Sequence, residues 1–232
     1  MHWAWIEQLT IGELVIDGPE AHHLLHVLRM RTGSSLVLFD GTGNVADAVI
    51  LETGRRDVKV LAAEIHQPQS RLKTRLTVAA APPKGDRLRT MVEKLTELGV
   101  HRLILLETER SVTTPGEARV EKLRASVVAA CKQARRPVLM ELQPLTSFNS
   151  LLHQIDPEKL TLFAAHPHKE VNPVPTCDGP EPVLLIGPEG GFTTQEVSLL
   201  HSAAAQFMAW PDTILRTETA AVVFATLLLH AR

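Results

Sequence analysis

The chain has 232 residues, of which 44% are hydrophobic and 22% are charged, with a formal net charge of -2. This length allows one large domain or two small ones, and the apolar content is too high for a disordered chain. The near-neutral charge excludes a wholly basic nucleic-acid binder but not a local basic face, and 4% aromatic residues with no tyrosine argue against a base-stacking sheet that reads single-stranded RNA.

The first seventy residues predict short strands separated by turns. Runs rich in Val, Leu and Ile predict strands at 13–17, 35–40, 44–52 and 57–65. A helix is expected from Pro19 to Met30, with proline near its start, and "DGTGN" predicts a turn between two strands. Short strands at this spacing suggest a small barrel. The polar stretch 66–75 is the expected linker.

From Leu76 onward, predicted strands alternate with predicted helices. Asp86 is the expected N-cap and Gly99 the C-terminal stop of the first helix. A long helix, "EARVEKLRASVVAACKQAR", follows, and Ser147 can cap the next one. The last helix, "ETAAVVFATLLLHA", is apolar nearly all round and is expected in the core or in a subunit interface. This alternation predicts a parallel α/β sheet with strands buried on both faces.

A glycine-rich loop joins an apolar strand to a helix in "VLLIGPEGGFTTQEVSLL" (183–200). Thr193 and Glu196 form a T-x-x-E capping box, so the helix begins just after Phe192. Ligands bind outside the carboxyl ends of parallel strands, and glycine lets a ligand approach the backbone. The loop matches neither G-x-G-x-x-G nor a Walker A motif, and Glu189 disfavours phosphate. On this pattern alone, a ligand site and a structural turn are equally good interpretations.

A second loop, at 209–223, also links a predicted strand to a helix. Arg216, Thr217, Glu218 and Thr219 follow one another just before the apolar helix. One interpretation is a helix cap, with Thr217 as the cap and Glu218 in the first turn. A cap requires only one such residue, so four polar residues with an arginine favour a ligand site.

The segments "LLIGPEGGFTTQEV" and "ILRTETAAV" resemble the two hallmark segments of the SPOUT methyltransferase superfamily. Within it, the chain is similar to the bacterial small-subunit (16S) ribosomal RNA uridine-N3 methyltransferase family. The other segments that carry this resemblance, in order over nearly the whole chain, are "HHLLHVLRMRTGSSLVLFDGTG" (22–43), "EKLTELGV" (93–100), "ETERSV" (107–112) and "AAHP" (164–167). The N-terminal segment makes the resemblance more specific than the glycine loop alone.

The resemblance implies a fold and a cofactor. Residues 1–70 would form a PUA-like RNA-binding β-barrel, and 74–232 a SPOUT α/β methyltransferase domain with a C-terminal trefoil knot. The family binds S-adenosylmethionine in the knot loops and acts as a homodimer. Here those loops are 164–167, 186–191 and 214–219, with apolar walls where cofactor pockets need them. The cofactor would bind Ala165, His166, Leu185, Ile186, Gly187, Glu189, Gly190, Gly191, Ile214, Leu215, Thr217 and Thr219.

The expected chemistry is methylation of uracil N3, which becomes nucleophilic when the ring is anionic. A cation near the two carbonyl oxygens stabilises that charge, and Arg216 is the candidate. Glu218 would orient Arg216 or accept the proton, although a simple first-turn helix charge explains it equally well. Ribosomal RNA, in the small subunit, would be held by local positive charge. The candidates, each of which could instead be an ordinary surface charge, are Arg29, Arg31, Lys84, Arg87, Lys94, Arg110, Arg135 and Arg136.

Metal binding is not expected, although eleven histidines are present. His22, His23 and His26 share one predicted helix, and His166 and His168 flank Pro167, but no Cys or carboxylate pattern joins them. Cys131 and Cys177 lack zinc-site spacing and are expected to be ordinary thiols. No apolar run reaches the length of a membrane span, and the N-terminus lacks signal-peptide features, so a cytoplasmic protein is expected.

One segment departs from the family pattern, and three other functions compete. In "CKQARRPV", Lys132 stands where the family usually has an acidic residue, and Pro137 shortens the following loop.

The first alternative function is a SPOUT enzyme that methylates a ribose 2′-hydroxyl, against which the N-terminal segment argues. The second is a non-catalytic RNA-binding module, and the third a nucleotide hydrolase, which the missing Lys-Ser/Thr disfavours.

Overall fold

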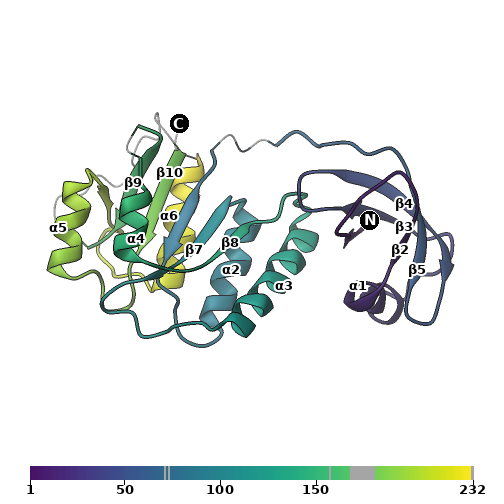
Figure 1. Cartoon of the computed structure of the whole chain (residues 1–232), viewed down its shortest axis with the longest axis horizontal. Coiled ribbons are helices and arrows are strands. Elements are labelled where there is room, and N and C mark those ends of the chain that lie inside the picture. Colours follow the sequence, from purple (N-terminus) through teal and green to yellow (C-terminus); the bar gives the residue numbers. More distant parts are fainter. Residues whose placement is uncertain (71, 73, 157, 168–180, 231–232) are drawn as a thin grey trace. The chain divides into compact units, whose positions relative to one another are not determined.

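The computed structural model describes residues 1–70, 72, 74–156, 158–167 and 181–230 (Figure 1). The chain divides into two compact units. Unit 1 comprises Met1–Arg71 with Val128–Leu139, and unit 2 comprises Leu72–Val127 with Met140–Arg232. The segment Val128–Leu139 therefore clusters with the N-terminal residues, which the sequence ranges did not anticipate. Among the described residues, no helix combines the length and apolar character that a membrane crossing requires.

Unit 1 is built on a five-stranded sheet in the order β1-β3-β4-β5-β2. Its strands are β1 (His2–Trp5), β2 (Gly12–Ile16), β3 (Ser35–Phe39), β4 (Val45–Thr53) and β5 (Val58–Ala62). The last four confirm the predicted strands. The first was not predicted, and it pairs parallel with β3 whereas the other neighbours are antiparallel.

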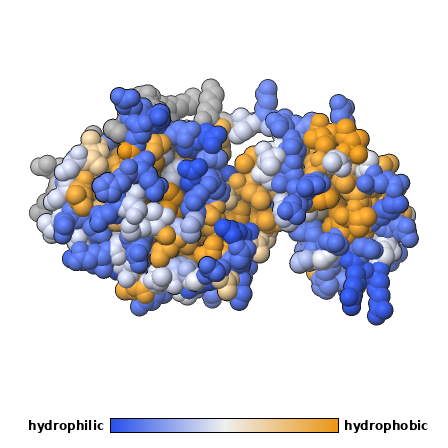
Figure 2. Space-filling model, viewed as in Figure 1, coloured by the Kyte–Doolittle hydropathy of each residue, from blue (hydrophilic) through white to orange (hydrophobic). Residues whose placement is uncertain are grey.

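Buried and exposed side chains alternate along the strands, so the sheet has one face toward the core and one outer face. In β4, Ala46, Ala48 and Ile50 are buried, whereas Val49 between them is 41% exposed. Val49 is paired in register with Leu61 of β5, which is also exposed. Figure 2 shows apolar side chains gathered on the viewed surface of this unit. The outer face of the sheet is therefore partly apolar.

The helix expected from Pro19 to Met30 is shorter and has two parts. An α-helical turn, α1 (Gly18–His22), is followed by a π-helical turn, η1 (His23–Val27). The Leu28 amide donates to the His23 carbonyl at 2.9 Å, five residues back. Arg29 then adopts a left-handed conformation with φ of 53°, which ends the helix. Periodicity cannot distinguish such a widened turn from an ordinary one.

The predicted turn at "DGTGN" is organised by a carboxylate. Oδ1 of Asp40 accepts hydrogen bonds from the amide and hydroxyl of Thr42, both at 2.8 Å, and Oδ2 accepts from Asn44 at 2.7 Å. Burial alone would raise the pKa of the Asp40 carboxyl, but the hydrogen bonds from Asn44 and Thr42 outweigh it and lower that pKa. The turn is therefore held by an ionised side chain.

The unusual Lys132 has a structural explanation within unit 1. Its ammonium group lies 2.5 Å from Oε1 of Glu20 in α1, and each of the two side chains is only 16% exposed. The lysine at this position is therefore matched by an acidic partner, and the pair ties the C-terminal part of α3 (Glu117–Ala134) to α1.

We expect Lys132→Ala to lower the free energy of unfolding of unit 1 by about 1–3 kcal/mol, because it leaves the Glu20 carboxylate half-desolvated without its cation. Urea unfolding measures this loss. Lys59→Ala is the matched control, since Lys59 pairs with Glu13 where both side chains are at least 43% exposed, and we expect a change below about 1 kcal/mol. Equal losses in the two variants would contradict the assignment.

Unit 2 contains a six-stranded sheet in the order β11-β9-β10-β6-β7-β8, and all of its strand pairs are parallel. The strands are β6 (Thr77–Ala80), β7 (Arg102–Glu107), β8 (Glu141–Ser147), β9 (Leu160–Ala165), β10 (Glu181–Ile186) and β11 (Gln206–Met208). The other helices are α2 (Arg87–Leu98), α4 (Phe148–Gln154), α5 (Thr194–Ser202) and α6 (Thr217–His230). The predicted parallel α/β class is confirmed.

Helices cover both faces of the unit 2 sheet, so its inner strands β6, β7 and β10 are largely buried. Leu185 of β10 belongs to a buried cluster with Leu151 of α4 and Leu200 of α5. The apolar helix α6 contacts β10, β6 and α2. Buried positions of α6 include Ala221, Phe224 and Leu228, so most of its apolar surface packs in the core.

Most of the predicted helix boundaries in unit 2 are confirmed. Gly99 ends α2 in a left-handed conformation with φ of 91°, and Ser147 caps α4 by accepting the Ser150 amide. Asp86 occupies the cap position of α2 without a side-chain cap bond. The path between β9 and β10 includes residues 168–180, which lie outside the described part of the chain, so the trefoil knot stays a prediction.

Candidate active site

A cavity of about 410 Å³ lies at the carboxyl ends of β9 and β10 in unit 2. The loops after β9, β10 and β11 supply most of its lining, and the loop after β7 and the start of α6 supply the rest. This is the edge of a parallel sheet at which ligands are expected. The lining residues are Arg110, Ala165, His166, Pro167, Ile186, Gly187, Pro188, Glu189, Gly190, Gly191, Phe192, Ile214, Leu215, Arg216, Thr217 and Ala220.

Each glycine of the loop after β10 has a steric role. A Cβ at Gly187 would lie 3.3 Å from the Phe192 ring, and a Cβ at Gly190 would lie 3.3 Å from Cδ of Arg110. Gly191 differs, because its φ is +66° and a Cβ there would meet no atom within 4 Å. Since Gly191 also lines the cavity, we expect a side chain at this position to project into the site.

The glycine loop is fixed by the loop that follows β7, a strand separated from β10 by β6 in the sheet. The Arg110 guanidinium donates to the Gly190 carbonyl at 2.7 Å. The buried carboxylate of Glu196 accepts the Thr193 amide at 2.8 Å, completing the predicted capping box, and also the Glu109 amide at 2.9 Å. Glu196 therefore joins the loop after β7 to the start of α5, a role that the capping-box pattern does not reveal.

Thr217 connects the glycine loop to the loop before α6. The helix α6 begins at Thr217 itself, so Arg216 occupies the position before the helix, and the interpretation of Thr217 as the cap is wrong. The Thr217 hydroxyl instead donates to the Gly187 carbonyl at 3.3 Å. Its side chain is buried in the lining of the cavity, where it holds the two loops together.

Arg216 and Glu218 face different surroundings. Arg216 is exposed at the cavity, and no hydrogen bond or ion pair joins its guanidinium to any described residue. Glu218 has a side chain that is 15% exposed, and its buried Oε2 has no hydrogen-bond partner among those residues. The nearest cation to Glu218 is Nη1 of Arg87, at 3.7 Å. Arg216 is therefore available to an incoming anionic group, whereas Glu218 is associated with Arg87.

Arg87, at the start of α2, bridges two acidic residues of the site. Its Nη2 lies 3.0 Å from Oε1 of Glu189 in the glycine loop, and its Nη1 faces Glu218 of α6. One guanidinium thus balances two carboxylates from different loops. Without it, the two negative charges would repel each other and Glu189 would be free to move within the cavity.

We expect Arg87→Ala to weaken binding of the small-molecule ligand of this cavity about tenfold, which corresponds to about 1.4 kcal/mol. Isothermal titration calorimetry measures the affinity, with S-adenosylmethionine as the ligand that the resemblance suggests. Arg89→Ala is the control, because Arg89 forms an ion pair with Glu93 on the same helix outside the cavity. A variant Arg87→Ala with unchanged affinity would show that the bridge does not position the loop.

The cavity brings together most of the predicted cofactor residues, from Ala165 and His166 through the glycine loop to Ile214, Leu215 and Thr217. It does not include Leu185 or Thr219. Leu185 is fully buried in the sheet core, because strand alternation directs it away from the face that Ile186 occupies. Thr219 is exposed beyond the lining. Pro167 and Pro188 line the cavity within two of the predicted loops, although they were not named among the cofactor residues, and Phe192 and Ala220 directly follow the predicted loops 186–191 and 214–219.

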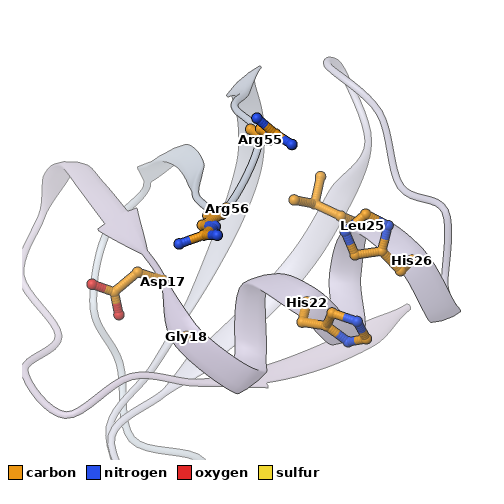
Figure 3. A pocket seen from close by; sticks show the side chains of 7 residues that line it. All are labelled: Asp17, Gly18, His22, Leu25, His26, Arg55 and Arg56. Carbon is orange, nitrogen blue, oxygen red and sulfur yellow. The ribbon is translucent and has the colours of Figure 1, made fainter.

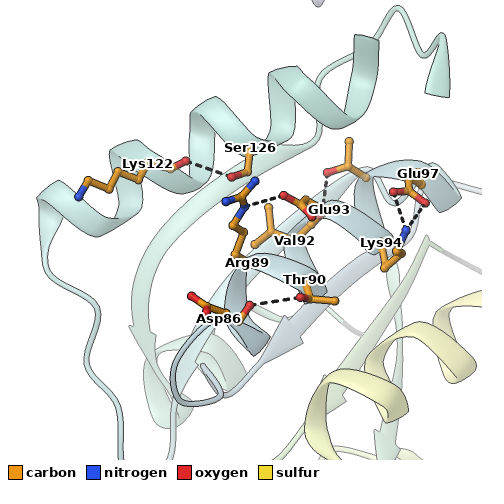
Figure 4. A network of polar contacts seen from close by, with 10 residues as sticks. Asp86, Arg89, Thr90, Val92, Glu93, Lys94, Glu97, Lys122 and Ser126 are labelled. Carbon is orange, nitrogen blue, oxygen red and sulfur yellow. Dashed lines mark hydrogen bonds and ion pairs between the residues drawn. The ribbon is translucent and has the colours of Figure 1, made fainter. Parts of the chain in front are cut away.

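The predicted RNA-contacting residues of unit 2 are mostly engaged within the protein. Arg87 pairs with Glu189 and Arg110 donates to the Gly190 carbonyl, so both arginines hold the glycine loop. Lys94 lies on the exposed side of α2 in an ion pair with Glu97 at 2.9 Å, within the surface network of Figure 4. Lys84 is exposed, and its carbonyl accepts Nε of Arg87. Lys84 is thus the candidate of unit 2 with the most freely placed charge.

The candidates of unit 1 differ in exposure. Arg29, Arg31 and Arg135 are exposed, and Arg29 and Arg135 have left-handed backbone conformations. Arg136 is half-buried, and burial lowers the pKa of its guanidinium. The three exposed arginines are therefore more accessible to a polyanion than Arg136.

Among the described residues, no group of three His, Cys, Asp or Glu side chains is arranged to hold a metal ion. The rings of His22 and His26 lie 4.8 Å apart. Cys131 is a buried free thiol. His168 and Cys177, considered in the sequence analysis, lie outside the described residues.

Two family models match the chain. A model described as an RNA methyltransferase domain matches residues 70–229, and one described as an RNA methyltransferase PUA domain matches 16–62. The chain belongs to the RNA methyltransferase family. The predicted SPOUT-type α/β domain with a PUA-like N-terminal domain is confirmed for this RNA methyltransferase.

Curated relatives of this RNA methyltransferase extend over most of its length. "Ribosomal RNA small subunit methyltransferase E" of Mycobacterium tuberculosis is 30% identical over 220 residues, covering 90% of this chain and 83% of the relative. The protein of the same name from Rickettsia conorii is also 30% identical over 220 residues, covering 90% and 86%. The family recognised from the sequence motifs is therefore confirmed.

Solved structures agree with this assignment. A putative methyltransferase from Legionella pneumophila, in complex with S-adenosylmethionine, is 26% identical with a TM-score of 0.86, covering 98% of this chain and 95% of that one. A probable rRNA methyltransferase from Porphyromonas gingivalis is 29% identical with a TM-score of 0.84, covering 97% and 95%. The described part of this RNA methyltransferase therefore has the fold of these enzymes.

The cavity of this RNA methyltransferase fits S-adenosylmethionine. Its volume falls in the range of about 300–1,000 Å³ that is typical of small-molecule sites. The Gly191 position leaves open space at the backbone, and Ile186, Ile214 and Leu215 supply apolar wall. Glu189 disfavours a phosphate ligand but is compatible with a cofactor that carries a positive sulfonium and no phosphate.

Proposed function

We propose that this RNA methyltransferase transfers a methyl group from S-adenosylmethionine to N3 of a specific uridine in small-subunit ribosomal RNA. The observation that carries the proposal is the cavity at the carboxyl edge of the sheet, where three loops surround a glycine-lined space and Arg216 has no competing partner among the described residues. The names of the curated relatives and the solved complex with S-adenosylmethionine support the substrate and the cofactor.

The three loops would hold the cofactor through backbone groups and apolar walls. Ala165, His166, Gly187, Gly190 and Gly191 line the cavity and would offer backbone groups to the cofactor, and Ile186, Ile214 and Leu215 would flank the adenine. When bound, S-adenosylmethionine supplies an electrophilic methyl group on a sulfonium. Thr217 and Arg110 keep the loops in place, so the site is preorganised for its ligand.

Arg216 would act on the uracil ring. Loss of the N3 proton spreads negative charge over the two carbonyl oxygens of the ring, and an arginine beside them stabilises that charge. The guanidinium is suited to this task, because it is planar and permanently charged. Since no described residue neutralises it, Arg216 can direct its full charge at the substrate.

Glu218 has a positioning role in this proposal. It does not line the cavity, and Arg87 is the cation beside it. The Glu218 carboxylate therefore positions the Arg87 guanidinium, and Arg87 in turn pairs with Glu189 of the glycine loop. These ion pairs connect the first turn of α6 to the glycine loop. A base that accepts the N3 proton is not assigned by this arrangement.

The remaining parts of the proposal concern the RNA and the assembly. Residues 1–70 would serve as the RNA-binding domain and 74–232 as the methyltransferase domain. Arg29, Arg31 and Lys84, all exposed, would contact RNA phosphates. We further propose that the enzyme works as a homodimer on the small ribosomal subunit, in the cytoplasm.

The test is a methylation assay with isotopically labelled S-adenosylmethionine. Small ribosomal subunits and naked ribosomal RNA serve as parallel substrates, and the digested RNA is analysed by mass spectrometry. We expect labelled 3-methyluridine and cofactor binding in calorimetry, with no binding of ATP. Label on a ribose 2′-oxygen would indicate the alternative SPOUT reaction. Absence of both label and cofactor binding would indicate a non-catalytic RNA-binding module.

A further inference from the structure

Unit 1 contains a second cavity, larger than the one at the glycine loop. Its volume is about 530 Å³, and it is contained entirely within unit 1. One side is formed by the turn between β4 and β5, and the other by α1 and η1 (Figure 3). The lining residues are Asp17, Gly18, His22, Leu25, His26, Arg55 and Arg56.

The strand side of this cavity carries uncompensated positive charge. Arg55 and Arg56 are exposed, and neither forms a hydrogen bond or an ion pair with any residue in the described ranges. Asp17 is the single carboxylate in the lining. The two lysines Lys59 and Lys132 of unit 1 differ, since Lys59 pairs with Glu13 and Lys132 with Glu20. The cavity therefore has an excess of positive charge that the protein itself does not use.

The turn presents the two arginines in a defined place. Its ends are joined by the last register pair of the two strands, Thr53 with Val58. Within the turn, the Gly54 amide donates to the Asp57 carbonyl at 3.0 Å. Arg55 and Arg56 lie between these two residues, so their backbone is anchored on both sides. Two adjacent guanidinium groups on an anchored turn can bind one or two phosphate groups.

The helix side of the cavity offers two imidazole rings and one apolar side chain. His22 comes from α1 and His26 from η1, and the centroids of their rings lie 4.8 Å apart with an interplanar angle of 51°. Both histidines are exposed, and Leu25 completes the wall. The π-helical turn that carries His26 is a rare conformation that is frequent at functional sites. This wall can receive a flat, aromatic base.

We propose that this cavity is a nucleotide subsite for the RNA substrate, with a backbone phosphate on Arg55 and Arg56 and an unstacked base against His22, Leu25 and His26. The proposal rests on the methyltransferase function proposed above, since it takes RNA as the ligand. Phosphate binding by arginine and base stacking on rings are the two contacts by which proteins hold single-stranded RNA. A segment of the RNA that is not paired would supply both groups.

The first experiment measures binding of an unmodified ribosomal RNA fragment that contains the uridine labelled in the methylation assay. Fluorescence anisotropy at several salt concentrations gives the affinity. We expect Arg55→Ala/Arg56→Ala to weaken binding at least tenfold. Loss of two phosphate contacts should also reduce the slope of log affinity against log salt by about 1.4, because each contact to single-stranded RNA contributes about 0.7. An unchanged slope would overturn the phosphate assignment.

The matched control removes two positive charges elsewhere. In Arg89→Ala/Arg124→Ala, both arginines are taken from surface ion pairs, with Glu93 and Glu121. We expect this variant to keep the wild-type affinity and salt slope. An equal loss in the control would overturn the proposal, because the effect would then follow total charge and not this cavity.

The histidine wall has a separate test. His22→Ala/His26→Ala should weaken binding severalfold with no change in the salt slope, because stacking on a ring releases no counterions. His22→Phe/His26→Phe should restore most of the affinity, because phenylalanine keeps an aromatic face. Failure of the phenylalanine variant to restore binding would overturn the stacking assignment.

The same preparations separate this inference from the proposed function. S-adenosylmethionine binding should be equal in all four variants, since the cavity lies in unit 1 and the glycine loop in unit 2. If the wild-type enzyme binds the RNA but forms no 3-methyluridine, the proposed function is wrong, and the binding measurements still show whether the cavity of unit 1 binds RNA. If Arg55→Ala/Arg56→Ala binds RNA as tightly as the wild type does, only the proposed nucleotide subsite is wrong.

Discussion

Arg216→Ala is expected to reduce kcat for uridine methylation by about 100- to 1,000-fold, the usual effect of removing one group that stabilises a developing oxyanion. Its affinity for S-adenosylmethionine should change less than about threefold. The physical reason is the placement of Arg216, which is exposed at the cavity with no partner among the described residues, so its charge is directed at the substrate. Single-turnover kinetics and calorimetry measure the two quantities separately.

The pH dependence gives a sharper measurement of the same role. In the wild type, Arg216 favours the anionic uracil, so the reaction proceeds at pH values where the free base keeps its N3 proton. In Arg216→Ala, the rate should rise steeply with pH, since hydroxide must then supply the anion without assistance. Arg216→Lys should lie between the two, because lysine keeps the charge but loses the planar fork.

Arg102→Ala is the control for this prediction. Arg102 is an arginine of the same unit, in an ion pair with Glu141 at 2.7 Å and outside the cavity lining. It should retain the wild-type kcat. If Arg216→Ala also retained the wild-type kcat, Arg216 would have no role in turnover. If it lost cofactor affinity and turnover equally, Arg216 would bind the cofactor. Either result would show that the charge-stabilisation mechanism is wrong.

The parts of this fold that depend on local sequence were predicted well. The parallel sheet of unit 2 follows from the alternation of apolar runs with amphipathic ones. Gly99, Ser147 and the Thr193–Glu196 capping box mark helix ends through interactions with the next few residues, and all of them are confirmed. Such signals need no knowledge of the tertiary structure.

The parts that depend on distant residues were not predictable. Strand β1 exists because it pairs with β3, more than thirty residues later in register. The second hydrogen bond of Glu196 reaches the amide of Glu109, 87 residues away in sequence. The positions of Leu185 and Ile186 depend on which face of β10 meets the cavity, and a strand buried on both faces carries no polar signal that would decide this.

The candidate site shows the same division. The glycine loop and Arg216 carried a family resemblance that located the cavity. The ion pairs of Arg87 with Glu189 and Glu218 depend on three separate elements, and in the sequence Arg87 was only one of several possible RNA contacts. Charge by itself does not distinguish an arginine that holds a loop from one that binds a polyanion.

Gly191→Val is expected to abolish S-adenosylmethionine binding, with at least a 100-fold loss of affinity in calorimetry. Two effects act together. Gly191 has a φ of +66°, a left-handed conformation that a β-branched residue adopts only with strain. In addition, its missing Cβ faces open space in the cavity lining, so the valine methyl groups would occupy room needed by the cofactor. Gly191→Ala should have the same effect to a smaller degree.

Gly33→Val separates the two effects, because Gly33 also has a left-handed φ, of +83°, and open space around its Cβ position, but it lies in unit 1. This control should lose stability through backbone strain, at least about 1–2 kcal/mol, and still bind the cofactor normally. A folded Gly191→Val that bound normally would show that the glycine loop is only a turn. Equal loss of binding in both variants would mean that strain, and not occupied space, removes the ligand.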